Sequence, residues 1–233
     1  MNLLNLKKEI KQHSNSKKAK LLQGFFKTGK GEYGEGDIFL GIVVPESRKL
    51  AIKYSSLPLK DVEQLLNSKI HEERLIALLL LVHNYQKHIE QREEIYKFYL
   101  KNTTYINNWD LVDLSCHKIV GKYLLDKDRA ILYTLVHSDN LWERRIAVIS
   151  TFEFIRNNQF DDSIKLSEIL LQDKHDLMHK AAGWMLREVG KKDISVLETF
   201  LKQHYKKMPR TMLRYAIERL PEKRRKAYLA GII

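Results

Sequence analysis

Cysteine is nearly absent from this chain of 233 residues, which has only Cys116. A single thiol cannot form an internal disulfide and has no partner at the spacing of a zinc site, so we expect a reducing compartment. Cys116 follows Leu114 and Ser115 in an apolar run, and we expect it to be a small buried side chain and not a nucleophile. Reactive side chains are therefore to be sought among other residue types.

Long apolar runs are also missing. The longest, from Leu75 to Val82, is much too short to span a bilayer, and the N-terminal segment MNLLNLKKEIKQHSNSKKAK lacks the apolar core of a signal peptide. Glycine and proline are scarce, at ten and four residues, while 44% of the residues are hydrophobic and 30% charged. This composition predicts a folded, helix-rich, soluble intracellular protein without an evident domain break.

Nucleotide-binding glycine motifs are missing as well. The one glycine-rich segment, residues 25–37 (FFKTGKGEYGEGD), does not have the order of glycine, lysine and hydroxyl residue found in a P-loop, and no strand precedes it. We therefore expect this segment to be a loop. It would link the first helices to Val44 and Pro45, where the proline suits the first turn of the next helix.

Positive charge is abundant and is concentrated at the two ends of the chain. The formal net charge is +12, with eight Lys and one Glu in residues 1–30, ten Lys or Arg and two Glu in residues 202–226, and a slight negative excess between them. Such an excess favours a polyanionic partner, either nucleic acid or an acidic membrane surface. Charge that serves only solubility is the simpler alternative.

Helical periodicity dominates the sequence from Leu57 onward, with apolar residues recurring at spacings of three and four. Short breaks divide the chain into helix pairs; they fall near residues 67–68, 101–102, 126–128, 138–139, 172–173, 191–193 and 209. Apolar helices carry a small alanine at related positions, namely Ala77, Ala147, Ala181 and Ala216. Their separations indicate a repeat of about 35 residues, with one unit between the first two alanines.

Stacked repeats predict an all-α fold, a curved superhelical solenoid of antiparallel helix pairs with a concave face. We expect residues 1–233 to form a single domain. Residues 1–56 would supply the N-terminal helices and the glycine-rich loop, and residues 57–233 the stacked repeats.

Trp109 and Asp113 are the most informative pair in the chain. Positions i and i+4 share one face of a helix, so the indole and the carboxylate would project into the same space and could hold a cation. A half-buried core residue beside a helix cap is the simpler interpretation. However, Asp113 stands about where the equivalent helices carry alanine, which is costly for a carboxylate unless it is partly solvated or paired.

Two further tryptophans lie beside a charge in helical segments, Trp142 with Arg145 and Trp184 with Arg187. We expect Trp142 to belong to the core. Equivalent helices of a solenoid could bring Trp109 and Trp184 onto one concave surface.

Four segments occur in an order that resembles a known family. They are FLGIVVPESR (39–48), NWDLVD (108–113), SDNLWERR (138–145) and KAAGWMLRE (180–188). Together they resemble the AlkD-like DNA alkylation repair glycosylases, which are built from HEAT-like helical repeats. The resemblance extends over nearly the whole chain.

This resemblance implies excision of cationic alkylated purines, such as 3-methyladenine and 7-methylguanine, by hydrolysis of the N-glycosidic bond. Asp113 matches the family's aspartate beside the sugar, Trp109 and Trp184 match its two sugar-facing indoles, and Arg145 matches a basic residue of the same cleft. No metal or organic cofactor is implied. The expected partner is double-stranded DNA containing alkylated bases, bound by a cytoplasmic monomer that associates with the nucleoid.

Several assignments within the resemblance have alternatives. A slip of one residue would move the role of Arg145 to Arg144, and Asp110 rather than Asp113 could point inward, although Asp110 suits the first turn of a helix. Phe25 and Phe26 could wedge against DNA, but we expect them in the core. For contacts with the DNA backbone we select basic residues at helix ends or repeat-equivalent positions: Arg48, Lys180, Arg187, Arg210 and Arg214.

Two other functions compete with a glycosylase. Helical solenoids often serve as interaction modules, so a non-catalytic scaffold that binds nucleic acid or an acidic protein is the main alternative. A membrane-surface binder acting through the basic ends lacks a strongly amphipathic terminal helix. Convergence of Trp109, Asp113 and Trp184 on a basic surface would favour the enzyme.

Overall fold

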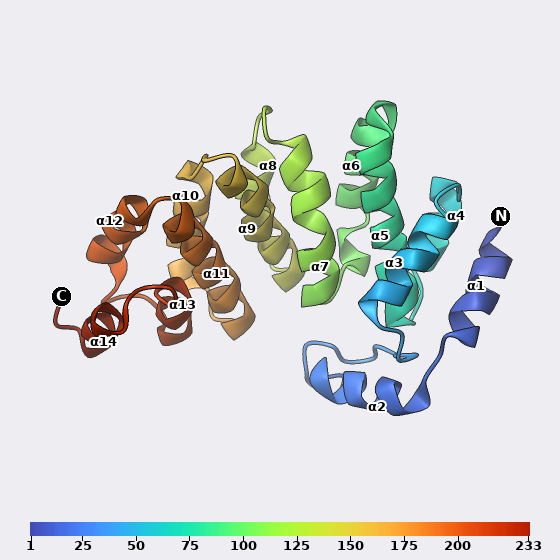
Figure 1. Ribbon diagram of the computed structural model, residues 1–233, viewed down its shortest axis with the longest axis horizontal. Helices are drawn as coiled ribbons and strands as arrows, with labels where there is room; N and C mark the ends of the chain where they lie inside the picture. Colours follow the sequence, from blue (N-terminus) through green and yellow to red (C-terminus); the bar gives the residue numbers. More distant parts are fainter. The chain divides into compact units, whose positions relative to one another are not determined.

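The computed structural model describes residues 1–233, which divide into two compact units, residues 1–115 and 116–233. Regular structure is helical, with fourteen α-helices (Figure 1) and a single isolated bridge between Ile38 and Ile70. The predicted all-α fold of antiparallel helix pairs is confirmed. The boundary drawn from the sequence at residue 56 falls inside the first unit, in the turn before α4.

The first unit is organised around one long central helix, α5, against which α3, α4 and α6 pack. Its elements are α1 (Leu3–Gln12), α2 (Ser16–Phe25), α3 (Val44–Lys53), α4 (Leu59–Leu66), α5 (His71–Lys87), η1 (Ile89–Gln91), α6 (Arg92–Lys101), η2 (Thr103–Tyr105) and α7 (Trp109–Cys116), whose last residue belongs to the second unit. A hydrogen bond of 2.9 Å between the Tyr99 and Ser115 hydroxyls joins α6 to α7.

The second unit stacks helix pairs around α9 and α11, which pack against each other (Figure 1). Its elements are the π-helical segment η3 (His117–Gly121), α8 (Ala130–Leu135), α9 (Leu141–Arg156), α10 (Asp161–Ile169), η4 (Leu170–Gln172), α11 (Asp176–Lys192), α12 (Ile194–His204), α13 (Arg210–Ala216) and α14 (Glu222–Ala230). Helix α11 also contacts α10, α12 and α13.

The repeat seen in the sequence corresponds to the second helix of successive pairs. Ala77, Ala147, Ala181 and Ala216 lie on α5, α9, α11 and α13, and each is at most 1% exposed. Helices α5 and α9 are buried on nearly every side, because their own apolar residues occur on all faces of the helix instead of forming one stripe. The interruptions expected between helices all fall outside the α-helices or at their ends.

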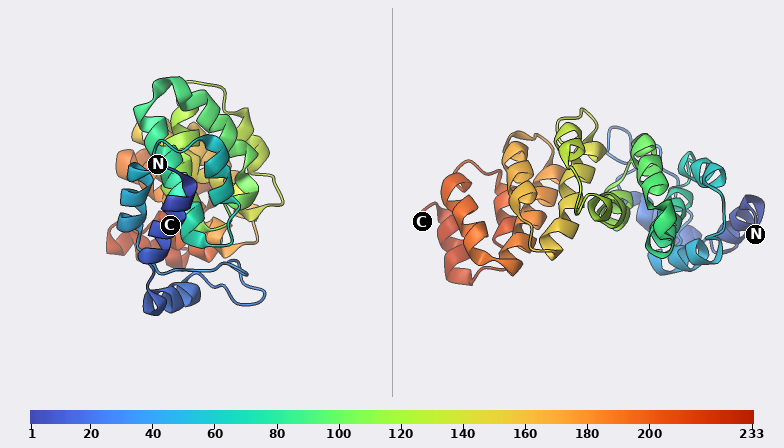
Figure 2. Two further views of the ribbon diagram at one scale, coloured as in Figure 1. Left: turned by 90° about the vertical axis from the view of Figure 1, so that its right-hand side faces the viewer. Right: turned by 90° about the horizontal axis from the view of Figure 1, so that it is seen from above.

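The glycine-rich loop connects α2 to α3 as expected, and Val44 and Pro45 open α3. Figure 2 shows α2 and this loop at the edge of the first unit. Phe26 is buried, but the expectation that Phe25 also packs in the core is wrong. Phe25 is 64% exposed, and α2, which ends at Phe25, buries none of its residues. Cys116 and Trp142 are both buried, as predicted.

Candidate functional site

Trp109 is the first residue of α7 and is half-buried. Its backbone N–H donates to the Asn108 side-chain oxygen at 2.8 Å, and its indole N–H donates to the Tyr33 hydroxyl at 3.3 Å. The indole ring stacks on Phe26, with centroids 5.0 Å apart and planes 18° from parallel. Trp109 is therefore oriented by residues of the glycine-rich loop, which the sequence did not connect with it.

Asp113 lies one helical turn after Trp109 and is also half-buried. The two side chains share one face of α7, because residues four apart on a helix lie above one another. By contrast, Leu111 and Val112 between them are fully buried. This face therefore offers a partly solvated carboxylate beside an indole.

Asp110 is the aspartate that points into the protein. It is 6% exposed, and its carboxylate accepts a hydrogen bond from the His71 ring at 2.9 Å and another from the Leu111 backbone N–H. Of the two aspartates that the sequence left as alternatives, Asp110 is thus the buried one, and the functional role of Asp113 stays a prediction. Asp110 fixes the first turn of α7, and Asp113 is the more accessible of the two carboxylates.

His71 joins three segments of the first unit. Its second ring nitrogen bonds Asp37 of the glycine-rich loop at 3.0 Å, and Arg74 donates to the same carboxylate at 2.6 Å. Burial, the largest single effect, lowers the pKa of His71, but the charges and hydrogen bonds of Asp110 and Asp37 outweigh it and raise this pKa from 6.5 to about 8. Burial raises the pKa of Asp37, but His71 and Arg74 together hold it below its usual value.

An aromatic ladder reinforces this connection. The Trp109 ring stacks on Phe26, Phe26 stacks on Phe39 at 5.0 Å, and Phe39 stacks on His71 at 4.4 Å. The indole is therefore held both by this ladder and, through the neighbouring Asp110, by the buried ion pairs. The sequence feature that could have indicated these buried ion pairs is the run His-Glu-Glu-Arg at the start of an apolar helix, because buried charges require partners.

Trp184 lies in the second unit, on α11, and is half-buried. Its indole N–H donates to Glu188, one turn later, at 3.1 Å. Its ring centroid lies 5.8 Å from that of Phe152, which in turn meets the edge of His117 at 5.3 Å. Burial lowers the pKa of His117 to about 4, with smaller contributions from nearby cations, so its ring is neutral near pH 7.

Arg145 is buried, at 5% exposure, and its guanidinium donates to the Leu177 carbonyl in the first turn of α11 at 2.8 Å. Arg144 has a different role. It pairs with Asp173 at 2.7 Å and donates to the Ser138 carbonyl six residues earlier, as Arg74 does with Ser68. Arg144 and Arg74 are thus repeat-equivalent residues that fasten a helix start to the preceding turn.

The residues selected for contacts with a nucleic-acid backbone differ in availability. Arg48 and Arg214 are exposed and form no ion pair. Lys180 pairs with Asp176 at 2.8 Å, and Arg187 pairs with Glu188 and Glu218. Arg210 is exposed and donates to the Leu229 carbonyl at 2.7 Å.

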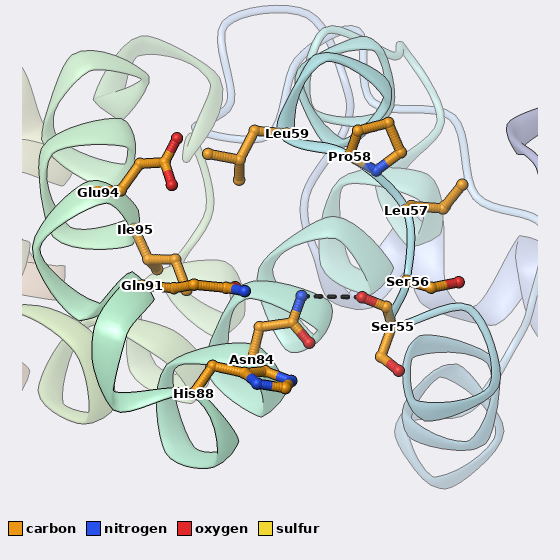
Figure 3. Close-up of a pocket in the computed structure, with 10 residues that line it drawn as sticks. All are labelled: Ser55, Ser56, Leu57, Pro58, Leu59, Asn84, His88, Gln91, Glu94 and Ile95. Atoms are coloured by element: carbon orange, nitrogen blue, oxygen red, sulfur yellow. Dashed lines mark hydrogen bonds between the residues drawn. The ribbon is translucent and has the colours of Figure 1, made fainter.

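One well-defined pocket is lined by none of these residues. It has a volume of about 480 Å³ and is bordered by the turn between α3 and α4, the end of α5 and the start of α6 (Figure 3). Within it the Asn84 amide donates to the Ser55 carbonyl at 2.9 Å.

No group of three or more His, Cys, Asp or Glu side chains is arranged to hold a metal ion. No helix is both long and apolar enough to cross a membrane.

The fold defines a helical-repeat protein whose half-buried site candidates are the Asp113 carboxylate and the rings of Trp109 and Trp184. Residues 6–220 match the profile of the family described as DNA alkylation repair enzyme, so the chain belongs to this family. The fold is similar to the solved structure of a predicted DNA alkylation repair enzyme from Enterococcus faecalis, with a TM-score of 0.69 and 19% sequence identity. That similarity covers 90% of this chain and 98% of the other. No curated protein matches the chain.

Proposed function

We propose that this protein is a DNA glycosylase that excises positively charged alkylated purines, such as 3-methyladenine and 7-methylguanine, from double-stranded DNA. Membership of the DNA alkylation repair family supports a role as a DNA repair enzyme. The observation that carries the more specific proposal is the half-buried Asp113 on the same face of α7 as Trp109.

The chemistry of the lesion suits these residues. A purine alkylated at N3 or N7 already carries a positive charge, so it is a good leaving group without a strong general acid. The remaining task is to stabilise the positive charge that develops on the deoxyribose and to align the attacking water. In the proposed reaction the C1′–N bond breaks and the base leaves with the bond electrons as a neutral purine, while water adds to C1′ and its released proton passes to the solvent.

Each candidate side chain has a role in this scheme. The Asp113 carboxylate would stabilise the cationic sugar and accept a hydrogen bond from water, and the face of Trp109 would lie against the same positive charge. Trp184 is proposed as a second indole for the sugar, and Arg145 as a basic residue that supports it through α11. Backbone contacts are proposed for Arg48, Lys180, Arg187, Arg210 and Arg214.

The test compares the wild-type protein with Asp113→Asn on methylated duplex DNA. Asparagine keeps the shape of the side chain but removes its charge, so we expect release of 7-methylguanine to fall about 10²- to 10³-fold, as on loss of one preorganised electrostatic group. Binding to the duplex should persist. A wild-type protein that binds DNA but releases no methylated base would support the scaffold function instead.

A further inference from the structure

The C-terminal part of the second unit carries a dense group of cations. Between residues 202 and 226 every Lys and Arg side chain is exposed, which defines the C-terminal basic surface: Lys202, Lys206, Lys207, Arg210, Arg214, Arg219, Lys223, Arg224, Arg225 and Lys226. It includes Arg210 and Arg214, which were selected from the sequence. Its last four members lie on α14, beyond residue 220, where the match to the family ends.

Most of these charges are not neutralised within the protein. Arg224 pairs with Glu198 and Lys226 with Glu222, while Glu218 is engaged by Arg187 of α11. The other cations of the surface form no ion pair with a carboxylate. Positive charge therefore remains available to a partner.

Helix α14 is anchored, so its exposed cations have a fixed position. Arg224 and Tyr228, one turn apart, face the rest of the unit: Arg224 pairs with α12, and the Tyr228 ring meets the edge of Tyr205 at 5.5 Å. The Tyr205 hydroxyl donates to the Ile233 carbonyl at 2.6 Å, and Arg210 donates to the Leu229 carbonyl. Figure 1 shows α14 beside α12 and α13 at the end of this unit.

Lys223 and Arg225 flank Arg224 on α14, one on each side, because neighbouring residues of a helix project about 100° apart. Both are exposed and unpaired. No large apolar side chain is exposed between residues 202 and 226. Protein interfaces usually have an apolar centre, whereas interfaces with nucleic acid are polar and strongly positive.

We propose that the C-terminal basic surface, with Lys223 and Arg225 of α14 as phosphate contacts, is a lesion-independent docking surface for double-stranded DNA. This inference rests on the proposed function for its choice of partner. The surface binds the phosphate backbone, and the release of counterions from the DNA favours this binding. Because it contacts no base, it binds undamaged and damaged duplex equally. Its role is to keep the protein on DNA during the search for lesions.

The test measures the affinity for undamaged duplex DNA, by fluorescence anisotropy, as a function of salt concentration. Each phosphate contact contributes about −0.9 to the slope of log K against log salt, so Lys223→Gln/Arg225→Gln should make the slope shallower by about 1.8. The matched control Lys60→Gln/Lys165→Gln removes the same charge from exposed sites on α4 and α10 and should leave the slope unchanged. Equal slopes for the two double variants would overturn the inference.

Two further measurements separate this inference from the proposed function. Release of methylated base by Lys60→Gln/Lys165→Gln should equal that of wild type, whereas Lys223→Gln/Arg225→Gln should need a higher protein concentration to reach the same release, because its docking on DNA is weaker. If the wild type releases no base, the glycosylase proposal fails, while the slope comparison still decides the docking surface. Loss of binding to vesicles containing acidic phospholipid, with an unchanged slope on DNA, would also overturn the inference.

Discussion

At the scale of single residues, burial separates tryptophans that look alike in the sequence. Each stands near a charge in a helical segment, yet Trp142 is 7% exposed while Trp109 and Trp184 are half-buried. The two half-buried indoles each use their N–H group in a hydrogen bond, with Tyr33 and with Glu188. Those bonds fix the ring orientations and leave part of each ring accessible.

Alanine substitutions of Trp142 and Trp184 should therefore have different effects. Trp142→Ala removes a buried ring and should lower the free energy of unfolding by about 3–5 kcal/mol. Trp184→Ala should cost clearly less stability but slow base excision about tenfold, because a cation over an indole is stabilised by roughly 1–2 kcal/mol. Urea unfolding and single-turnover excision measure the two effects. A larger stability loss for Trp184→Ala would contradict this division.

His71 makes the stability of the first unit depend on pH. Its pKa is raised from 6.5 to about 8 in the folded protein, so its protonation stabilises the fold fully below about pH 6.5, and that stabilisation is lost as pH rises through 8. The shift corresponds to about 2 kcal/mol. The free energy of unfolding should therefore fall between pH 6 and pH 9 by about 2 kcal/mol more in the wild type than in His71→Gln. Equal pH dependence in both proteins would show that the Asp37–His71–Asp110 connection does not act in this way.

At the scale of helices and loops, the close packing of η3 against α9 is a feature that the periodicity of apolar residues does not reveal. The π-helical segment η3 packs against α9 at Gly121, where an added Cβ would lie 2.2 Å from the Ser150 carbonyl oxygen and 3.1 Å from the Glu153 Cβ. Since π-helical turns are rare, this segment could not be foreseen from the apolar spacing.

Gly121→Ala should force η3 away from α9 and lower the free energy of unfolding by about 1–3 kcal/mol. Gly24→Ala is the matched control, because a Cβ at Gly24 on α2 would meet nothing within 4 Å. That substitution should raise the stability by up to about 1 kcal/mol, since alanine favours a helix over glycine. Denaturant titrations of both variants measure the change in the free energy of unfolding. An unchanged stability of Gly121→Ala would contradict the tight packing.

The position of the glycine-rich loop could be predicted from the sequence, but its contacts could not. Its position before Val44 and its lack of a P-loop pattern were foreseen, because both depend on local order along the chain. Its contacts were not. Asp37, Phe26 and Tyr33 meet His71 and Trp109 across separations of more than thirty residues, and no periodic pattern encodes such pairings.

At the scale of the whole molecule, the repeat was the feature most open to prediction. A recurring alanine every 35 residues or so indicated the second helices of stacked pairs, and these residues are indeed buried on α5, α9, α11 and α13. Trp109 and Asp113 were selected as site candidates because their spacing on a helix puts them on one face, and both are half-buried on α7. That Asp110 is held by His71 depends on tertiary contacts and emerged only from the structure.

The proposal for the whole protein, a glycosylase that acts on alkylated DNA, depends on the activity of Asp113. The most direct measurement is the release of free 7-methylguanine from methylated duplex DNA by the wild-type protein and by Asp113→Asn, detected by mass spectrometry. We predict release by the wild type and a loss of about 10²-fold or more in the variant, with DNA binding retained. Equal release by both proteins, or none by the wild type, would contradict the account.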